Sequence, residues 1–592
     1  MKTLPEVTKA VAVLGCVSLL GSLFSYASLT MAQEVEPSPT QNSPQIALAD
    51  AGSGGKESGA VATGPTFPIT RFQVEGNVVL SADKAQAALA SFVGADGNMS
   101  KIDAAVIALR NAYAAAGYPI VQIYPPQQTI NDGLVVLRVV EGKLSAIGVA
   151  GNKRYDEANI RNSVPALKEG QDPNVKDVAA AVALANENPA KQVAVNFQPG
   201  ADPGDVIARI DVTEEDPSKS VIAYNNYGTH ATGYDIISYS YQNANLFNRD
   251  HTLTADFSTT VQHPSDVKNF SFGYRIPFYS IGWSLDLIAA YSDSATNSTQ
   301  TGATSLGTLQ FTGKGTILGA RMNESLPGLG EYRQKITYEL DYKNFNDQCG
   351  INGVSTGSCG TVTSQPLILS YIGTLTTPTL QAGGNISYVQ NIPGGPNGED
   401  TEYAAARLGA SRNWNAWRLG GYVVKPFAGD WQVRANLTMQ QTSRILIPSE
   451  QFGIGGSSSV RGFDERVLAG DKGTDLNLEL YTPDFGSHLS GAANADATAN
   501  SAVPSNHKLR GVFFIDYGSV RNNDSLTVGT ATLSSVGLGL RYEYKKSFNL
   551  KLDIGLAQHT NVDSSWNTVI VKLNDDSGRW LGPVQLSASY SF

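Results

Sequence analysis

Charged residues are scarce in this chain of 592 residues, where Lys, Arg, Asp and Glu together make up 16%. The formal net charge is −10 and no basic cluster stands out to neutralise phosphates, which argues against a nucleic-acid partner. The six histidines are scattered without metal-ligand spacing, and no serine sits in a nucleophile elbow. We therefore predict that the protein is not an enzyme and that it uses neither a metal nor a cofactor.

Long apolar runs are confined to the amino end, so no helix of the mature chain is expected to span a bilayer. The single run, Ala10 to Leu29, lies in the context of a secretory signal over residues 1–32. A lipoprotein signal ending at Cys16 is the alternative, but the apolar run continues past that cysteine. After export only Cys349 and Cys359 remain, in a segment rich in Gly, Ser and Asn, and an oxidising compartment predicts a disulfide between them.

Alternation with a period of two dominates the chain from residue 218 to the end. In the last ten residues the aromatic and aliphatic side chains fall on one face of an extended strand and the serines fall on the other. A soluble half-buried strand would alternate in the same way, but the recurrence of the pattern favours a membrane β-barrel, and ten tilted residues rise roughly 25 Å. We expect sixteen antiparallel strands over residues 218–592, beginning near Val221, Ile236, Thr252, Asn269, Trp283, Leu309, Tyr332, Thr361, Leu380, Tyr403, Trp431, Thr474, Lys508, Val536, Ser547 and Pro583.

An even number of strands places both ends of the barrel on the same side of the membrane. The domains before residue 218 and the carboxyl-terminal Phe592 are therefore expected to face the periplasm, and the segment with the two cysteines to face outward. The last strand should pair with the strand near Val221, because this closes the sheet and removes both edges. Phe592 and Tyr590 resemble the terminal aromatic signal by which outer-membrane barrels are recognised for insertion, which implies outer-membrane lipid and the barrel-assembly machinery as partners.

Two copies of one small domain precede the predicted barrel. The pattern Phe72-x-Val74-x-Gly76-Asn77 returns as Ile147-x-Val149-x-Gly151-Asn152, and Val139-x-Glu141 returns as Val212-x-Glu214. We predict the order β-α-α-β-β in each copy, over residues 67–142 and 143–217.

Residues 33–66 are rich in Pro, Ser, Gly and Ala and are predicted to form a linker, with a helical turn or two over residues 44–51.

A long segment, residues 444–473, interrupts the late strands and contains Val460-Arg461-Gly462-Phe463 after a Gly-rich run. A phosphate-binding loop is a weak interpretation, because no lysine–hydroxyl pair and no helix follow. The segment lies between a strand whose inner face is polar and a strand whose inner face carries Asp475 and Glu479. A flexible surface loop is the other interpretation that these residues allow on their own.

The chain resembles the outer-membrane assembly and two-partner-secretion superfamily. The repeated domain is similar to the polypeptide-transport-associated (POTRA) domain, and Val460-Arg461-Gly462-Phe463 matches the VRGF signature of a loop that folds back into the barrel. A second family element, an aspartate followed by a glycine in the next strand, is matched by Asp516 and Gly518, with Asp516 facing the lumen. The resemblance implies an ion pair between Arg461 and Asp516, with Asp475 and Glu479 as rival partners.

The resemblance covers residues 69–592 and implies a two-partner-secretion transporter of the outer membrane. Such a protein binds an extended, unfolded segment of a large exoprotein, an adhesin or a cytolysin, through its POTRA domains and conducts that chain to the cell surface. A barrel-assembly factor and a passive porin are the alternatives; the best-known assembly factors carry more than two POTRA domains, and a porin has no reason to carry any. Some relatives have an amino-terminal plug helix, but residues 33–66 show no convincing amphipathic helix, so the folded-in loop is the expected obstruction.

Overall fold

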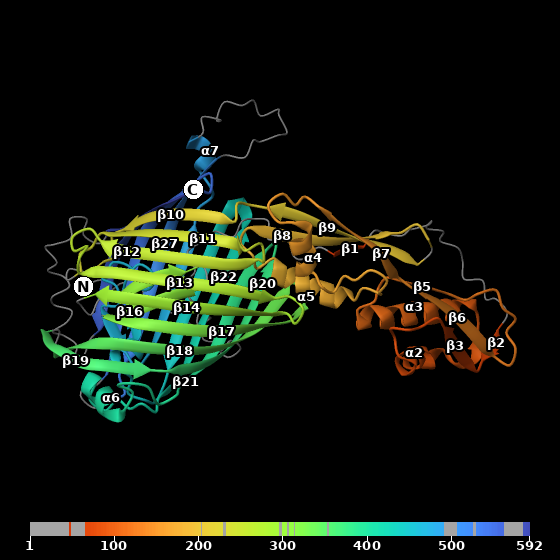
Figure 1. The fold of residues 1–592 in the computed structure, drawn as a ribbon, viewed down its shortest axis with the longest axis horizontal. Coiled ribbons are helices and arrows are strands. Elements are labelled where there is room, and N and C mark those ends of the chain that lie inside the picture. The colour runs from red at the N-terminus through yellow and green to blue at the C-terminus, as the bar shows by residue number, and fades with distance from the viewer. Residues whose placement is uncertain are drawn as a thin grey trace, which may run out of the picture.

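A computed structural model shows two small domains that extend from one end of a large barrel (Figure 1). No helix in the part of the chain that it describes is both long and apolar enough to cross a membrane. The predicted signal over residues 1–32 and Pro583 lie outside the described residues. The described segments are residues 46–48, 66–202, 204–228, 232–294, 299–304, 307–312, 314–351, 354–489, 506–524, 529–561 and 584–592.

Sixteen strand positions in these segments close into an antiparallel barrel, which confirms the predicted number. One position holds two strands, because β19 (Val354–Ser364) pairs with the outer part of β18 and β20 pairs with its inner part. The strands in order around the wall are β10 (Ser218–Asn225), β11 (Ile236–Leu246), β12 (His251–Thr260), β13 (Val267–Phe278), β14 (Trp283–Ser294), β17 (Lys314–Leu329), β18 (Tyr332–Ile351), β20 (Pro366–Thr377), β21 (Leu380–Asn391), β22 (Asn415–Phe427), β23 (Trp431–Gln441), β26 (Lys472–Tyr481), β27 (His507–Arg521), β28 (Thr530–Tyr544), β29 (Phe548–Asn561) and β30 (Val584–Ser591).

Side chains alternate along each wall strand between the two faces of the sheet. On β27, Phe513 and Ile515 are 50% and 57% exposed, whereas Phe514 and Asp516 are buried. This alternation confirms that the apolar outer face and the polar inner face were assigned correctly from the period of two.

The barrel closes where β30 pairs with β10, from Val221 opposite Ser591 to Asn225 opposite Ser587. The predicted partner of the last strand is therefore correct. Beyond this ladder the side chain of Asn226 extends the seam, because its amide donates to the carbonyl of Val584 at 2.8 Å and accepts from the backbone N–H of Leu586 at 2.7 Å.

The strand predicted near Tyr403 is wrong, because this residue lies in helix α6 (Asp400–Ala406). The helix belongs to the connection between β21 and β22, at the end of the barrel away from the two small domains (Figure 1). Tyr403 is fully buried and packs with Trp414. The Glu402 side chain accepts from the backbone N–H of Glu399 at 3.2 Å, which is one half of a helix-start signature that the alternation analysis overlooked.

The two small domains share one topology. In the first, β3 (Arg71–Glu75) lies parallel to β6 (Leu134–Glu141), and β5 (Val121–Tyr124) lies antiparallel to β6. In the second, β7 (Lys143–Ala150) lies parallel to β9 (Asp205–Glu214), and β8 (Lys191–Pro199) lies antiparallel to β9. The helices are α2 (Ala82–Leu89) and α3 (Met99–Ala116) in the first, and α4 (Glu157–Ser163) and α5 (Val175–Ala185) in the second; β2 (Phe67–Ile69), β4 (Gly94–Gly97) and a 3-10 turn, η1 (Ala90–Phe92), are additions to the first copy.

The repeated residues have the same structural role in both copies. A Cβ atom at Gly76 would lie 2.4 Å from a carbonyl oxygen of β6, and one at Gly151 would lie 2.2 Å from a carbonyl oxygen of β9. Glu141 accepts two backbone N–H groups of the turn after β3 at 2.8 and 3.0 Å, and Glu214 accepts backbone N–H groups of the turn after β7 at 2.7 to 3.2 Å. Both sequence repeats therefore preserve the same turn, in which a carboxylate accepts the backbone N–H groups that have no partner in the strands.

A third segment joins the sheet of the second domain. Strand β1 (Ile46–Leu48) pairs in parallel with β8 at Val195 to Phe197. The helical turn expected over residues 44–51 is therefore wrong for these three residues, which take their conformation from the free edge of a sheet rather than from local propensity.

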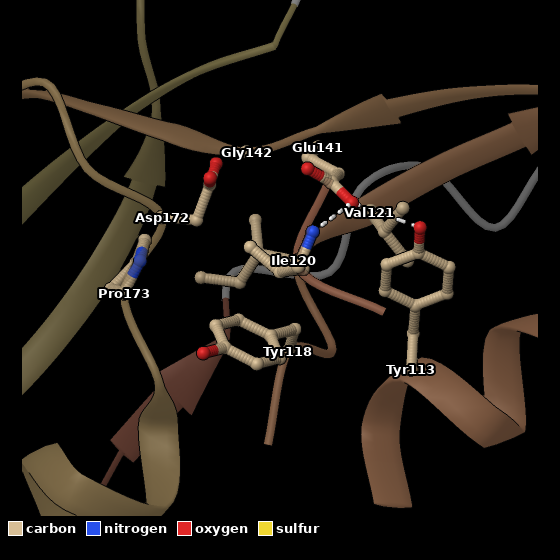
Figure 2. A pocket seen from close by; sticks show the side chains of 9 residues that line it. Tyr113, Tyr118, Ile120, Val121, Glu141, Gly142, Asp172 and Pro173 are labelled. Carbon is tan, nitrogen blue, oxygen red and sulfur yellow. Dashed lines mark hydrogen bonds between the residues drawn. The ribbon is translucent and has the colours of Figure 1, made fainter. Parts of the chain in front are cut away.

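The two domains meet at a small pocket of about 10 Å³ (Figure 2). The last turn of α3 meets the start of α5 there, and the backbone N–H of Val175 donates to the carbonyl of Gly117 at 2.8 Å. Glu141 lies on one side of the pocket, where it also accepts from the Tyr113 hydroxyl at 2.9 Å, and Asp172 lies on the other side. The contact makes one periplasmic arm of the two domains.

Cys349 lies on β18, the seventh wall strand, and Cys359 lies on β19, which pairs with the outer part of β18. Their side chains lie outside the described residues, so the disulfide stays a prediction.

Candidate functional site in the barrel lumen

The connection between β23 and β26, residues 442–471, turns back into the barrel. Its two limbs pair briefly as β24 (Phe452–Ile454) and β25 (Leu468–Gly470), and the tip between them is buried. The tip contains the sequence Val460-Arg461-Gly462-Phe463, in which Val460 is fully buried and Arg461 is 2% exposed.

Arg461 lies among acidic side chains of the wall. Its Nε and Nη2 atoms donate to the two carboxylate oxygens of Asp516 at 2.8 and 2.7 Å, and its backbone N–H donates to the same carboxylate at 3.1 Å. Its Nη1 atom donates to Glu479 at 2.6 Å and lies 3.6 Å from Asp553. A planar guanidinium can occupy three such acceptors at once because its N–H groups point in fixed directions.

The acidic side chains around Arg461 are fixed by further partners. Asp516 accepts from the amide of Asn477 at 3.0 Å and from the hydroxyl of Ser535 at 3.3 Å. Glu479 accepts from the hydroxyl of Tyr481 at 3.2 Å. Asp553 accepts two bonds from Arg541, at 2.7 and 3.1 Å. These wall contacts restrict the acidic side chains independently of Arg461, which lowers the entropic cost of binding the tip.

Three residues of the wall, Phe514, Gly518 and Gly555, pack closely against the loop tip. The guanidinium of Arg461 lies over the ring of Phe514, 3.6 Å from its centroid, in a cation–π contact. Gly462 has a φ of 89°, and a Cβ atom there would lie 2.4 Å from the carbonyl oxygen of Gly555 on β29. A Cβ atom at Gly518 would lie 2.9 Å from the side chain of Val460. The glycine of the aspartate–glycine element thus makes room for the tip that the aspartate binds.

An apolar cluster flanks the ionic contact. Phe463 is buried in it, and the carbonyl of the same residue accepts from Gln585 of β30 at 3.5 Å. The cluster joins residues of the loop to residues of the wall: Ile454, Val460, Phe463, Leu468, Val520, Ala531 and Leu533.

The residues predicted from the sequence lie close together at the loop tip, but they bind different partners. Asp516 and Glu479 both bind Arg461, whereas Asp475 accepts from the hydroxyl of Ser459 at 2.8 Å. The sequence patterns did not point to Asp553, nor to the cation–π contact of the Phe514 ring with Arg461. The inward position of Asp553 follows from alternation on β29, but no motif marks it.

This arrangement holds the tip of the loop in place through buried ion pairs. A closed barrel with an internal loop anchored by ion pairs, preceded by two small α+β domains, is the architecture expected of a two-partner-secretion transporter. The family model for the haemolysin secretion/activation proteins ShlB/FhaC/HecB matches residues 204–542, and the model for the ShlB-type POTRA domain matches residues 67–142. The chain belongs to the ShlB/FhaC/HecB family, and it is an outer-membrane two-partner-secretion transporter with its POTRA domains in the periplasm.

Relatives of similar architecture carry the name CdiB. The outer membrane transporter CdiB of Dickeya dadantii (strain 3937) is 24% identical over 422 residues, which cover 70% of this chain and 72% of the relative. The outer membrane transporter CdiB of Escherichia coli O6:K15:H31 is 23% identical over 442 residues, covering 72% of this chain and 70% of the relative. Among solved structures, CdiB from Escherichia coli superposes with a TM-score of 0.70 at 16% identity, and CdiB from Acinetobacter baumannii with 0.63 at 16%, each covering 100% of both chains. These likenesses confirm the fold.

Proposed function

We propose that this transporter exports one large adhesin- or cytolysin-type protein, whose unfolded amino-terminal segment binds the POTRA arm before the chain enters the barrel. The observation that carries the proposal is the filled lumen: a passive porin needs an open path, whereas here a loop with buried ion pairs occupies it. An obstruction of this kind suits a transporter that opens for a specific client.

Two features of the first POTRA domain favour capture of an extended segment. Its three-stranded sheet ends at β5, and a terminal strand offers unpaired backbone groups to an added strand. Val78 and Ile107 are 81% and 55% exposed, and Tyr124 at the end of β5 is 43% exposed. Exposed apolar side chains of this kind suit contact with a client that has not yet folded.

The loop tip is proposed to be the gate, with Arg461 and Asp516 as its latch. Passage of a polypeptide requires the tip to leave the lumen, and folding of the client outside the cell supplies the driving force. This role involves no covalent chemistry, so we propose no enzyme activity.

Insertion of the barrel is proposed to depend on its last residues. Tyr590 and Phe592 are 52% and 62% exposed, and their rings stack at 6.0 Å. Two exposed aromatic rings at the end of the closing strand suit recognition by the barrel-assembly machinery and contact with outer-membrane lipid.

The test uses the full-length transporter in lipid vesicles and the unfolded amino-terminal region of its candidate secreted partner. The wild type is expected to capture this region and to export the full partner. A variant lacking residues 67–142 is the comparison, and it is expected to insert as a barrel but to lose capture. Equal capture by both proteins would contradict the proposal. Client-independent insertion of other barrels would favour an assembly factor instead.

A further inference from the structure

Buried ion pairs hold the root of the folded-in loop as well as its tip. We define the root as residues 446–450 of the descending limb together with Asp471, the last residue of the ascending limb. The root lies at the outer end of the barrel, where α6 and its connection, residues 392–414, cover it. Among the described residues, its polar partners differ from the residues that bind Arg461.

Asp471 is fully buried and collects partners from three connections. Arg407, which follows α6, forms a two-bond ion pair with it. The backbone N–H of Leu446 donates to it at 2.9 Å, and the backbone N–H of Asn523, in the β27–β28 connection, donates at 2.7 Å. One carboxylate therefore ties the ascending limb to the descending limb and to two other outer connections.

Arg407 has two further partners in the outer connections. Its Nη1 atom also donates to the carbonyl of Leu446 at 2.8 Å, and its Nη2 atom donates to Asp524 at 2.6 Å. Leu446 and Ile447 are fully buried against Tyr403 and other apolar residues of the cover. The same connection thus supplies both the apolar cover and the cation of the root.

Glu450 forms a second buried contact, with the wall itself. It is 2% exposed and lies 3.2 Å from Lys343 of β18 and 2.8 Å from Arg418 of β22. The hydroxyl of Ser364 donates to it at 3.1 Å. Each oxygen of this carboxylate binds one cation of the wall, so the descending limb cannot leave the wall without leaving buried charges unpaired.

We propose that Arg407 is a positioning residue for the gate, and that the α6 connection is a second lock, which holds the loop root independently of the Arg461 latch. When the tip is released, the root remains attached, and the loop pivots within the barrel. Full opening requires the outer lock to yield as well. The proposal rests on the proposed role of the loop as the obstruction.

The experiment compares single-channel conductance of purified full-length variants in planar lipid bilayers. Arg407→Gln is expected to raise the open probability by about tenfold, because a buried acid without its partner shifts a two-state equilibrium by at least that factor. Arg461→Gln is expected to produce small openings, and the double variant larger openings than either single variant. Arg407→Lys, which keeps the charge but loses the two-pronged geometry, should lie between wild type and Arg407→Gln.

Arg412→Gln is the matched control, because Arg412 lies in the same connection but pairs with the exposed Glu399. It should conduct like the wild type. Every variant is first checked for heat-modifiable mobility, which shows an intact barrel. Wild-type conductance for Arg407→Gln, together with a double variant no different from Arg461→Gln, would overturn the proposal. Capture and export of the client are measured separately, so a failure of the lock and a failure of the proposed function are distinguishable.

Discussion

Lys191 of the second POTRA domain and Asp250 of the β11–β12 turn form an ion pair that is completely enclosed, with their side chains 0% and 1% exposed. The Lys191 ammonium also donates to Asn159 at 3.1 Å and lies 5.1 Å from the centroid of the Tyr155 ring. The hydroxyl of Tyr279, from the β13–β14 turn, donates to Asp250 at 2.7 Å. The Lys191 ammonium also lies 5.9 Å from the centroid of the Tyr279 ring, so the domain contacts the barrel at two turns.

Removing the carboxylate from this contact should loosen the arm. Asp250 has a φ of 59°, which Asn tolerates, so Asp250→Asn tests the charge without new backbone strain. We expect the docked state to lose about 3–5 kcal/mol, the usual effect of leaving a buried charge unpaired. Spin labels on the domain and the barrel should show a broadened distance distribution. Arg154→Gln, at an exposed pair with Asp216, is the control and should leave the distribution unchanged.

The pH dependence of the Asp250→Asn variant follows from Lys191. Burial lowers the pKa of Lys191, and Asp250 partly restores it. Without the carboxylate, the docked POTRA domain favours the neutral form of Lys191. The domain should therefore dock most weakly at low pH, and its docking should strengthen as the pH rises toward about 10.4, the ordinary pKa of a lysine. The same distance measurement across pH checks this. A variant that docks equally at all pH values would contradict it.

The three acids near the tip should differ in importance. Asp516 accepts three bonds from Arg461 and Glu479 accepts one, whereas Asp475 binds only the nearby Ser459 in the contacts described here. Asp516→Asn is therefore expected to increase the protease sensitivity of the loop most, Glu479→Gln less and Asp475→Asn least. Limited proteolysis of intact cells measures this order. If Asp475→Asn had the largest effect, the latch would have to be reassigned.

Gly462 is expected to be irreplaceable at the tip. In Gly462→Ala the new methyl carbon would lie 2.4 Å from the carbonyl oxygen of Gly555, and the left-handed backbone adds roughly 1 kcal/mol of strain. We expect the tip to move away from the wall at Gly555 and the conductance of the barrel to rise. Gly282→Ala is the control for backbone strain alone, because Gly282 has a φ of 70° and nothing lies within 4 Å of its added methyl. Equal conductance in the two variants would show that the contact between the tip and Gly555 tolerates the methyl group.

The barrel was predictable from the sequence because a period of two assigns each residue to a face without knowledge of its neighbours. Asp516 could be placed in the lumen on that basis, and its motif pointed to Arg461. A period of two fails at Tyr403, because a helix of seven residues is too short for a clear helical period and its start is marked only by Glu399 and Glu402.

The remaining contacts depend on distances that sequence patterns do not encode. Asp553 and Arg461 are separated by 92 residues, and they meet only because the tilt of the wall brings β29 beneath the loop tip. Arg407 and Asp471 meet because one outer connection folds over another. The pairing of β1 with β8 involves three residues, too few for any periodicity.

The joint between the POTRA domains should respond to acid in the direction set by Asp172. One of its oxygens is buried without a hydrogen bond, and desolvation followed by the charge of Glu141 raises its pKa, against the opposing effect of Lys143. A raised pKa means that the assembled joint binds the proton more tightly than the separated one. Above the raised pKa, Asp172 is charged and weakens the contact between the two domains. As the pH falls toward 3.8, the ordinary pKa of the group, Asp172 becomes protonated and this destabilising effect disappears.

Asp172→Asn should consequently strengthen the joint at neutral pH, by less than about 1 kcal/mol because the carboxyl group is partly solvated. Hydrogen exchange at the amides around Gly117 and Val175 in the full-length protein measures the opening of the joint. Exchange should be slower in the variant than in the wild type at pH 7, and the difference should vanish near pH 3.8. Asp103→Asn, on the exposed face of α3, is the control and should show no such convergence. Faster exchange in Asp172→Asn at pH 7 would mean that the charged carboxylate holds the joint together.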